Sequence, residues 1–99
     1  MVIITQIAYP TTSVQDMAKR FLESPQAPEF MTRRGPFINA SKTEGIQSFS
    51  LWELDNSRLA EGMKFLGGYM KIFFGVPGFT YEIRPFFHVD EALAMIGMG

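Results

Sequence analysis

The stretch from Thr80 to Val89, TYEIRPFFHV, is the most informative about the fold, because it is the last strand-like segment of the chain and its two sides differ. Successive side chains of a strand point to opposite faces. The two sets are Tyr81, Ile83, Pro85 and Phe87, which resemble a core face, and Glu82, Arg84, Phe86 and His88, which mix charge with apolar surface. We expect the first set to contact helices and the second to face whatever covers the other side of the sheet.

The two segments before this strand predict a hairpin. Residues 46–54, IQSFSLWEL, alternate as a strand does, with Phe49 and Leu51 expected in the core. The opposite side of that strand would carry Ile46, Ser48, Ser50 and Trp52. Residues 30–45 read as the partner strand, bulged near the Gly-Pro pair at 35–36 and closed by the turn SKTEG.

Residues 2–9, VIITQIAY, predict the first strand, which Pro10 ends. This segment does not alternate cleanly between apolar and polar residues. It is therefore expected to be covered on both faces, as central strands with two buried sides are.

Two amphipathic helices are predicted between the strands. The first begins at Thr12 or Ser13 and ends before Pro25, and the second is capped by Asp55 or Asn56. The two apolar stripes are Val14, Met17, Ala18, Phe21 and Leu22, and then Leu59, Met63, Leu66, Met70 and Phe73. A kink or a close contact is expected at Gly67-Gly68. Residues 90–97, DEALAMIG, predict a terminal helical turn capped by Asp90 and stopped by Gly97.

The resulting order, β-α-β-β-α-β, is that of an α+β, ferredoxin-like domain: a four-stranded antiparallel sheet with two helices on one face, here over residues 1–99. The helices leave the second face bare. With Trp52 and Phe86 assigned to it, that face would be an apolar patch, and burial would contribute roughly 2 to 3 kcal/mol for each ring. Homodimerisation through the sheet face is the expected solution, and it would also cover the first strand.

The composition narrows the function classes. The 99 residues carry a formal charge of -1, with no basic segment suited to nucleic acid or to an anionic membrane. Without cysteine there is no disulfide and no thiolate metal site. The N-terminal segment lacks the features of a signal peptide, and no segment is apolar enough to span a bilayer. We expect a soluble cytoplasmic domain without a cofactor.

The stretches SFSLWELDNSRLAEGM and FTYEIRPFFHVDEALAMI, which lie within residues 45–96, resemble small bacterial single-domain members of the dimeric α/β-barrel superfamily. The shared pattern is a strand ending in an acidic residue, a capped helix, and a last strand of the form aromatic-Glu-aliphatic-x-Pro. The resemblance implies two ferredoxin-like protomers packed sheet against sheet around a cavity. It does not imply a particular activity.

Five residues are candidates for ligand binding in such a cavity: Arg84, Glu82, Trp52, Phe86 and Ser50. An enclosed Arg84 would need a carboxylate, for which Glu82 is nearest, or an anionic ligand. At a strand edge, the same arginine can instead reach water along its apolar stem. Trp52 could stack on a planar ligand or fill the dimer core.

His88, the only histidine, is the catalytic candidate, as a general acid or base; the alternative is an exposed residue at a strand-to-helix junction. No spacing of acidic residues around it suggests a metal site. Some oxygenases of the resembled superfamily use Asn, Trp and His, but neither Asn39 nor His88 matches their pattern. Arg33 and Arg34 are expected to flank a solvated bulge.

Three functions follow as hypotheses. The first is a homodimer that binds a small, partly apolar molecule, either neutral or anionic, in the sheet-face cavity. The second is a cofactor-independent monooxygenase or isomerase, which needs little more than a dry pocket and one or two polar groups. The third is a protein-interaction module that uses the sheet face or an open strand edge.

Overall fold

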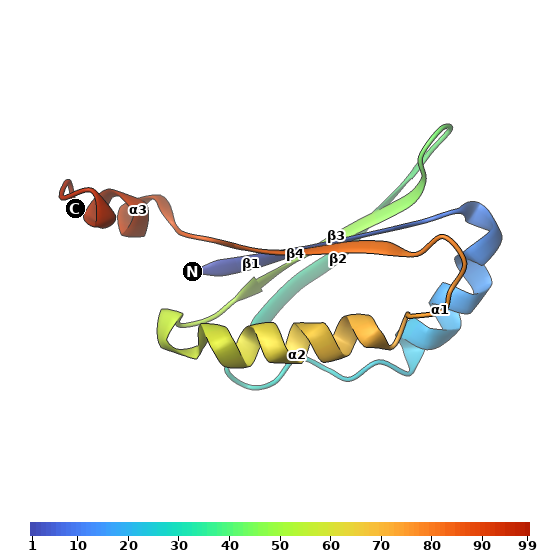
Figure 1. Cartoon of the computed structure of the whole chain (residues 1–99), viewed down its shortest axis with the longest axis horizontal. Coiled ribbons are helices and arrows are strands. Elements are labelled where there is room, and N and C mark those ends of the chain that lie inside the picture. The colour runs from blue at the N-terminus through green and yellow to red at the C-terminus, as the bar shows by residue number, and fades with distance from the viewer.

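The computed structural model of the protein describes residues 1–99 and contains one four-stranded sheet with three α-helices (Figure 1). Neighbouring strands are antiparallel, and the sheet order is β2-β3-β1-β4. The elements in chain order are β1 (Val2–Tyr9), α1 (Val14–Leu22), β2 (Thr32–Ser41), β3 (Gly45–Glu53), α2 (Leu59–Lys71), β4 (Thr80–Phe86) and α3 (Val89–Met95). This α+β architecture is compatible with the predicted ferredoxin-like arrangement.

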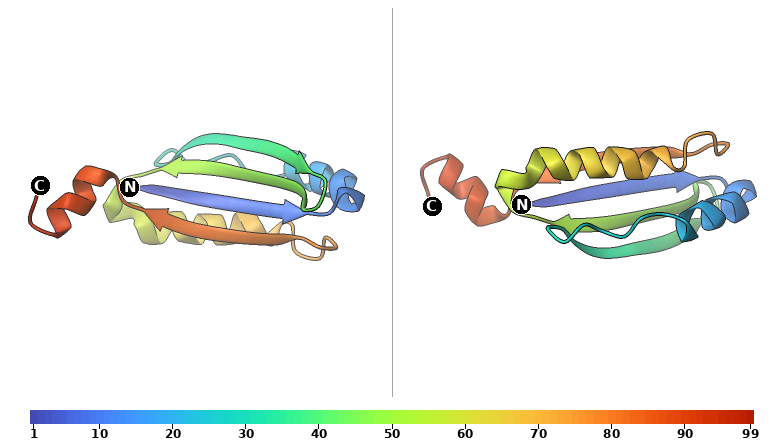
Figure 2. Two further views of the ribbon diagram at one scale, coloured as in Figure 1. Left: turned by 90° about the horizontal axis from the view of Figure 1, so that it is seen from above. Right: turned by 90° about the horizontal axis from the view of Figure 1, so that it is seen from below.

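The molecule has two layers, a sheet and a layer of helices on one side of it. Helices α1 and α2 lie on the same side, and the other face of the sheet is open (Figures 1 and 2). Helix α3 projects beyond the end of the sheet and covers neither face (Figure 2). Any residue of the sheet that points away from α1 and α2 is therefore uncovered within one chain.

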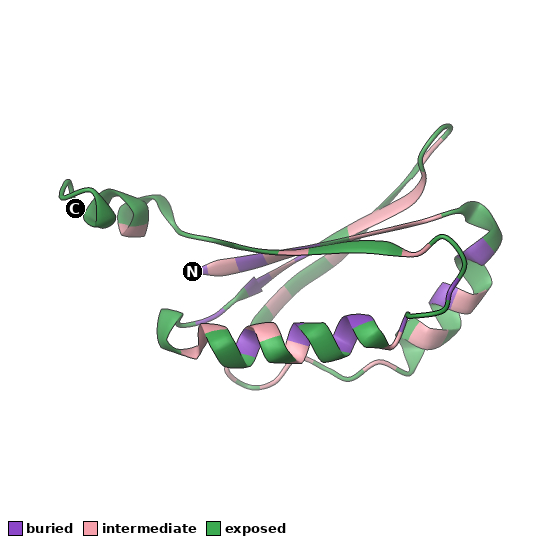
Figure 3. Ribbon diagram, viewed as in Figure 1, coloured by how far each residue is buried: buried purple, intermediate pink, exposed green.

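The core lies between α2 and the sheet. One buried cluster joins Ile3 and Trp52 of the sheet to Leu66 of α2, and a second joins Met17 of α1 to Tyr69 and to Phe73, just beyond the end of α2. In Figure 3 the buried positions of α2 lie along one side, whereas β4 and α3 are almost entirely exposed. Only 15 of the 99 residues are buried, so the core of a single chain is small.

The two faces of β3 are the reverse of the prediction. Trp52 is fully buried on the helix side, where Ser50 also lies, whereas Phe49 is 44% exposed on the open face. Directly opposite residues of an antiparallel pair share a face, and Trp52 is paired with the buried Ile3. Since β3 carries large apolar residues at both alternating positions, alternation within this strand could not choose between its faces.

For β4 the predicted core side is confirmed at Ile83 only, because Tyr81, on the same side, is 42% exposed and Pro85 is exposed as well. Ile83 packs against both core clusters on the helix side, and Glu82, Arg84 and Phe86 are exposed. Phe87 was expected in the core, but the strand ends at Phe86 and Phe87 is 47% exposed. The chain leaves the sheet at that point to begin α3.

The first strand is covered by helices on one side only. Ile3 and Thr5 are buried beneath the helices, and the indole Nε1 of Trp52 donates a hydrogen bond of 2.9 Å to Thr5 Oγ1. On the open side, Val2 and Ile4 are half-buried and Gln6 is exposed. The second cover expected for this strand is not supplied by the chain itself.

The hairpin is as predicted. The β2–β3 register shifts between Arg34 and Phe37, which is the expected bulge at the Gly-Pro pair, and the strands pair up to Ser41 and Gly45. Gly45 has a φ of 76°, and a Cβ there would lie 2.7 Å from the carbonyl oxygen of Tyr9. Glycine is needed at this turn for both reasons.

Several local predictions for the helices are wrong. Ser13 makes no capping hydrogen bond to α1, and its hydroxyl instead donates to the carbonyl of Pro77 at 2.7 Å. Asp55 does accept from the backbone N–H of Ser57, as expected of a cap. Helix α2 runs uninterrupted through Gly67-Gly68, where an added Cβ would meet nothing within 4 Å. The close contact is at Gly62, where an added Cβ would lie 2.6 Å from Leu54 Cδ1.

Candidate functional site

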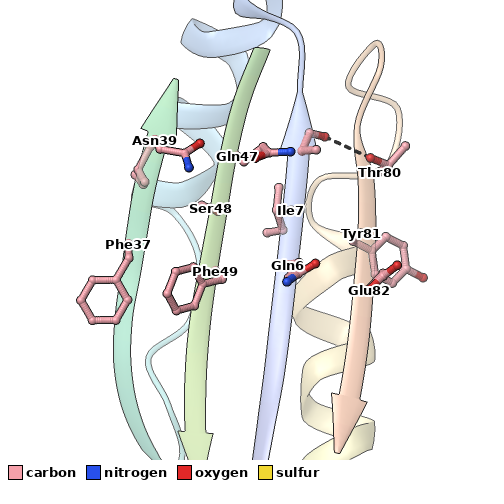
Figure 4. A pocket seen from close by; sticks show the side chains of 12 residues that line it. Gln6, Ile7, Phe37, Asn39, Gln47, Ser48, Phe49, Thr80, Tyr81 and Glu82 are labelled. Atoms are coloured by element: carbon pink, nitrogen blue, oxygen red, sulfur yellow. Dashed lines mark hydrogen bonds between the residues drawn. The ribbon is translucent and has the colours of Figure 1, made fainter. Parts of the chain in front are cut away.

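A hollow of about 400 Å³ lies on the open face of the sheet and crosses all four strands (Figure 4). Antiparallel register places its residues in rows, one of which runs Phe37, Phe49, Gln6 and Glu82 from β2 to β4. The next row runs Asn39, Gln47, Ala8 and Thr80. We call this feature the sheet-face hollow.

The chemistry of the sheet-face hollow changes from one side to the other. Phe37 and Phe49 form an aromatic pair with ring centroids 5.2 Å apart. The rest of the lining is largely polar, with the amide of Gln47 on β3 beyond this pair and, on β1 and β4, the amide of Gln6 and the carboxylate of Glu82 (Figure 4). Such a surface can contact an apolar ring at one end and accept hydrogen bonds from donors at the other.

Of the predicted ligand-binding residues, Glu82, Arg84 and Phe86 are together on the exposed side of β4. Glu82 lines the sheet-face hollow, and Arg84 lies one row away, with its guanidinium 5.3 Å from the ring of Phe86. Arg84 and Glu82 do not form an ion pair with one another within the chain. The charges of β4 are thus both available to a partner or a ligand.

The prediction that Trp52 and Ser50 share that face is wrong. Both are buried on the helix side, where Ser50 Oγ accepts hydrogen bonds from Arg33 and the ring of Trp52 packs edge-on against Phe65 and Tyr69. The physical cause is the β1–β3 register, which pairs Trp52 with Ile3 and Ser50 with Thr5. Within one chain the tryptophan is a core residue.

His88 lies at the end of the sheet, outside both the sheet-face hollow and the helix-side pocket described below. Its Nε2 is 2.6 Å from Glu53 Oε1, and both side chains are about half exposed. Its backbone N–H donates to the carboxylate of Glu91, which also pairs with the N-terminal ammonium at 2.9 Å. These hydrogen bonds lower the pKa of Glu91 to about 2, the bond from His88 having the largest effect. The arrangement tethers α3 to the sheet.

A second cavity, of about 340 Å³, lies between α1 and the sheet; we call it the helix-side pocket. Its walls are mostly apolar, with Val14 and Phe21 from α1 facing Ile7 and Ile38 from the sheet. Tyr9 also lines it, and burial raises the pKa of the Tyr9 phenol, as expected where water is partly excluded.

Arg33 reaches this pocket and is the residue that the sequence interpretation missed. It was expected beside Arg34 in solvent, but only Arg34 is exposed. The Arg33 guanidinium lies 4.4 Å from the centre of the Trp52 ring and 5.2 Å from that of Tyr69. The available signal was alternation: of two adjacent arginines in a strand, one must point to the helix side. Choosing which one requires the β2–β3 register, which pairs Arg33 with Trp52.

No group of three or more acidic or histidine side chains is placed to hold a metal ion. None of the helices combines the length and the apolar character needed to cross a bilayer.

The chain matches no protein-family model, and it has no significant match among curated proteins or solved structures. The likeness to the dimeric α/β-barrel superfamily therefore remains a prediction from the sequence pattern.

Proposed function

We propose that this protein is a homodimer of ferredoxin-like protomers, packed through their open sheet faces, that binds a small, partly apolar molecule in the enclosed cavity. The observation that carries the proposal is the open face itself. Phe37, Phe49 and Phe86 on that face are 46%, 44% and 38% exposed, and Ile4 and Leu51 are only half-buried beside them. A contiguous exposed patch of this kind usually marks an interface.

Charge on the open face favours one orientation of the second copy. Two-fold symmetry matches a surface with itself. One possible two-fold axis runs perpendicular to the strands, between the row of Glu82 and the row of Arg84. Rotation about it exchanges these two rows, so each Glu82 would lie opposite the partner's Arg84. With an axis along the strands, Arg84 would instead lie opposite the partner's Arg34, because both residues belong to one row. Opposite charges across an interface favour the first arrangement.

The exposed helix α3 is compatible with the same assembly. Its apolar residues Val89, Met95 and Ile96 are 67% exposed or more, and the helix projects past the end of the sheet (Figure 1). A second copy over the open face would offer these side chains a surface to pack on.

We propose that the ligand binds in the sheet-face hollow. Between two packed sheets, the paired rings of Phe37 and Phe49 would contact apolar parts of a ligand, and Gln6 and Glu82 would accept its hydrogen bonds. In the favoured orientation Arg84, one row away, would pair with the partner's Glu82, and an anionic group of the ligand would compete with that carboxylate for it. His88 lies outside this hollow, so it is not part of the proposed site.

The test is the solution mass of the unmodified chain, for which we expect twice 11.2 kDa at micromolar concentration. Phe49→Glu places a charge at the centre of the open face and should yield folded monomer. Leu22→Glu is the matched control, because Leu22 is 82% exposed at the end of α1 and should leave the dimer intact. A folded monomer of the unmodified chain at these concentrations would exclude the dimer.

The same experiment separates the interaction-module alternative. In that case the unmodified chain would be monomeric alone and would form a stoichiometric complex with a different protein, which Phe49→Glu would abolish. The exposed aromatic rings that motivate the dimer also motivate this alternative.

A further inference from the structure

Arg33 is a half-buried cation without an anionic partner. None of the four ion pairs of the chain includes it. Its Nε and Nη2 donate to the hydroxyl of Ser50 at 3.2 and 3.0 Å, and Nη2 also donates to the hydroxyl of Tyr69 at 3.2 Å. These acceptors are neutral, and Nη1 donates to no protein atom. An uncompensated charge away from bulk water attracts an anion strongly.

The surroundings of Arg33 fix the guanidinium in place. The ring of Trp52 lies beneath it, and Tyr69 and Phe21 are also within 6 Å of its Cζ. Because Nε and Nη2 are held by Ser50 and Tyr69, the guanidinium is fixed with its Nη1 amino group free to donate to a carboxylate. Lysine at this position would lose that geometry.

The remainder of the helix-side pocket is apolar. Val14, Ala18 and Phe21 of α1 form one wall, and Ile7, Ile38 and Ile46 of the sheet form the other. Val14 and Phe21 are nevertheless 38% and 39% exposed, so α1 does not close fully onto the sheet. Asp16, the one acidic residue within α1, is engaged by Arg20 at 3.0 Å and forms no ion pair with Arg33.

From this combination we propose that the helix-side pocket binds an amphipathic monocarboxylate. The carboxylate would pair with Arg33, and an aliphatic or aromatic tail would lie between α1 and the sheet against Val14 and Phe21. One cation in an apolar pocket selects a single negative charge, since a second charge on the ligand would be left unpaired. This site is on the opposite side of the sheet from the sheet-face hollow, and it does not depend on dimerisation.

The chain carries its own reporter for the test, because Trp52 is its only tryptophan and touches the Arg33 guanidinium. Tryptophan emission would be followed while decanoate or decanol is added below the micellar concentration of each. Decanoate should change the emission saturably and bind about tenfold or more tighter than decanol, the range expected for hydrogen bonds to a charged group. Equal affinities, or no saturable change with decanoate, would overturn the proposal.

Variants locate the site. Arg33→Gln should remove the preference for decanoate, and Arg33→Lys should retain part of it. Arg34→Gln is the matched control: this neighbouring arginine points to the opposite face, and its loss should leave decanoate affinity unchanged. Ala18→Phe, at an exposed position of α1, should fill the pocket and weaken both ligands without touching Arg33. This variant keeps the proposal testable if Arg33→Gln does not fold.

Two outcomes count against the site. Decanoate binding that Ala18→Phe leaves unchanged would exclude the helix-side pocket, and a loss on Arg34→Gln would place the ligand on the open face. Solution mass measured in the same samples separates this result from the dimer: monomeric protein that binds decanoate through Arg33 would support this inference while contradicting the proposed assembly.

Discussion

The two faces of the sheet are built from alternate residues of the same four strands, yet they differ in how well they are covered. On the helix side, Ile3 and Trp52 are buried against Leu66 of α2, and the polar groups of Thr5 and Ser50 are hydrogen-bonded. On the open side, Phe37 and Phe49 contact one another but remain nearly half exposed. One face completes a core within the chain, and the other presents similar side chains with nothing over them. The comparison shows that hydrophobic content does not by itself identify the core face.

Truncating the core side of β3 should have the largest effect. Trp52→Ala removes a fully buried ring together with its hydrogen bond to Thr5, and should lower the free energy of unfolding by about 3 to 5 kcal/mol. Phe49→Ala, on the open side of the same strand, should cost less than about 1 kcal/mol in dilute protein. Urea unfolding of both variants measures the difference. Equal losses at low concentration would show that the two faces are equally buried in one chain.

Two glycines of α2 differ in the same way, since one lies in the covered interface with the sheet and the other is surrounded by open space. Gly62→Ala would place a methyl group against Leu54 and should cost about 1 to 3 kcal/mol. Gly68→Ala, in the same helix but with open space around it, should gain about 0.5 to 1 kcal/mol through helix propensity. Thermal unfolding of the two variants would show whether each one lowers or raises the stability of the fold. A stabilising Gly62→Ala would contradict the close contact with Leu54.

Charge reversal tests how the open face is covered. In the proposed dimer, Glu82→Arg brings like charges together and should weaken dimerisation about tenfold or more. The double variant Glu82→Arg with Arg84→Glu should restore much of it, because the opposite-charge pairs are re-formed. Sedimentation equilibrium of the three proteins measures the dimer dissociation constant. A double variant as weak as the single one would exclude this orientation of the two copies.

The smallest expected effect is the change in the docking of α3 when Glu91 is protonated, because this helix is held by few contacts. Glu91 has a folded-state pKa of about 2, below its ordinary value of 4.5, so its contribution to docking is fully present above pH 4.5 and is lost as the pH falls toward 2. Amide chemical shifts of α3 should change over that range before the sheet unfolds. Glu91→Gln should remove the pH dependence in this range, and an unchanged titration in this variant would assign it to another group.

Much of the fold could be predicted because its signals are local. The strand Val2–Tyr9, the two amphipathic helices and the bulged hairpin each depend on residues close together in the chain. The capping hydrogen bond of Asp55 was predictable for the same reason. The one expected of Ser13 does not form, because the Ser13 hydroxyl donates instead to the carbonyl of Pro77, 64 residues away. A local capping motif cannot reveal that an acceptor distant in the sequence will compete for the hydroxyl.

The candidate site was less predictable, and Trp52, Phe49 and Arg33 show why. Each lies in a strand where either alternating set could have been the core face, so the composition of the strand left the choice open. Pairing with Ile3 places Trp52 inside, and pairing with Trp52 then places Arg33 inside as well. A shift of one residue in register would exchange the two faces.

Local sequence patterns are thus enough to predict the elements, their order and the presence of more apolar strand surface than two helices can cover. Which half of that surface is core follows only from the folded chain, in which Trp52 lies under the helices and the guanidinium of Arg33 packs against its ring. The physical reason is that periodicity is encoded in neighbouring residues, whereas register is set by contacts between strands that are far apart in the chain.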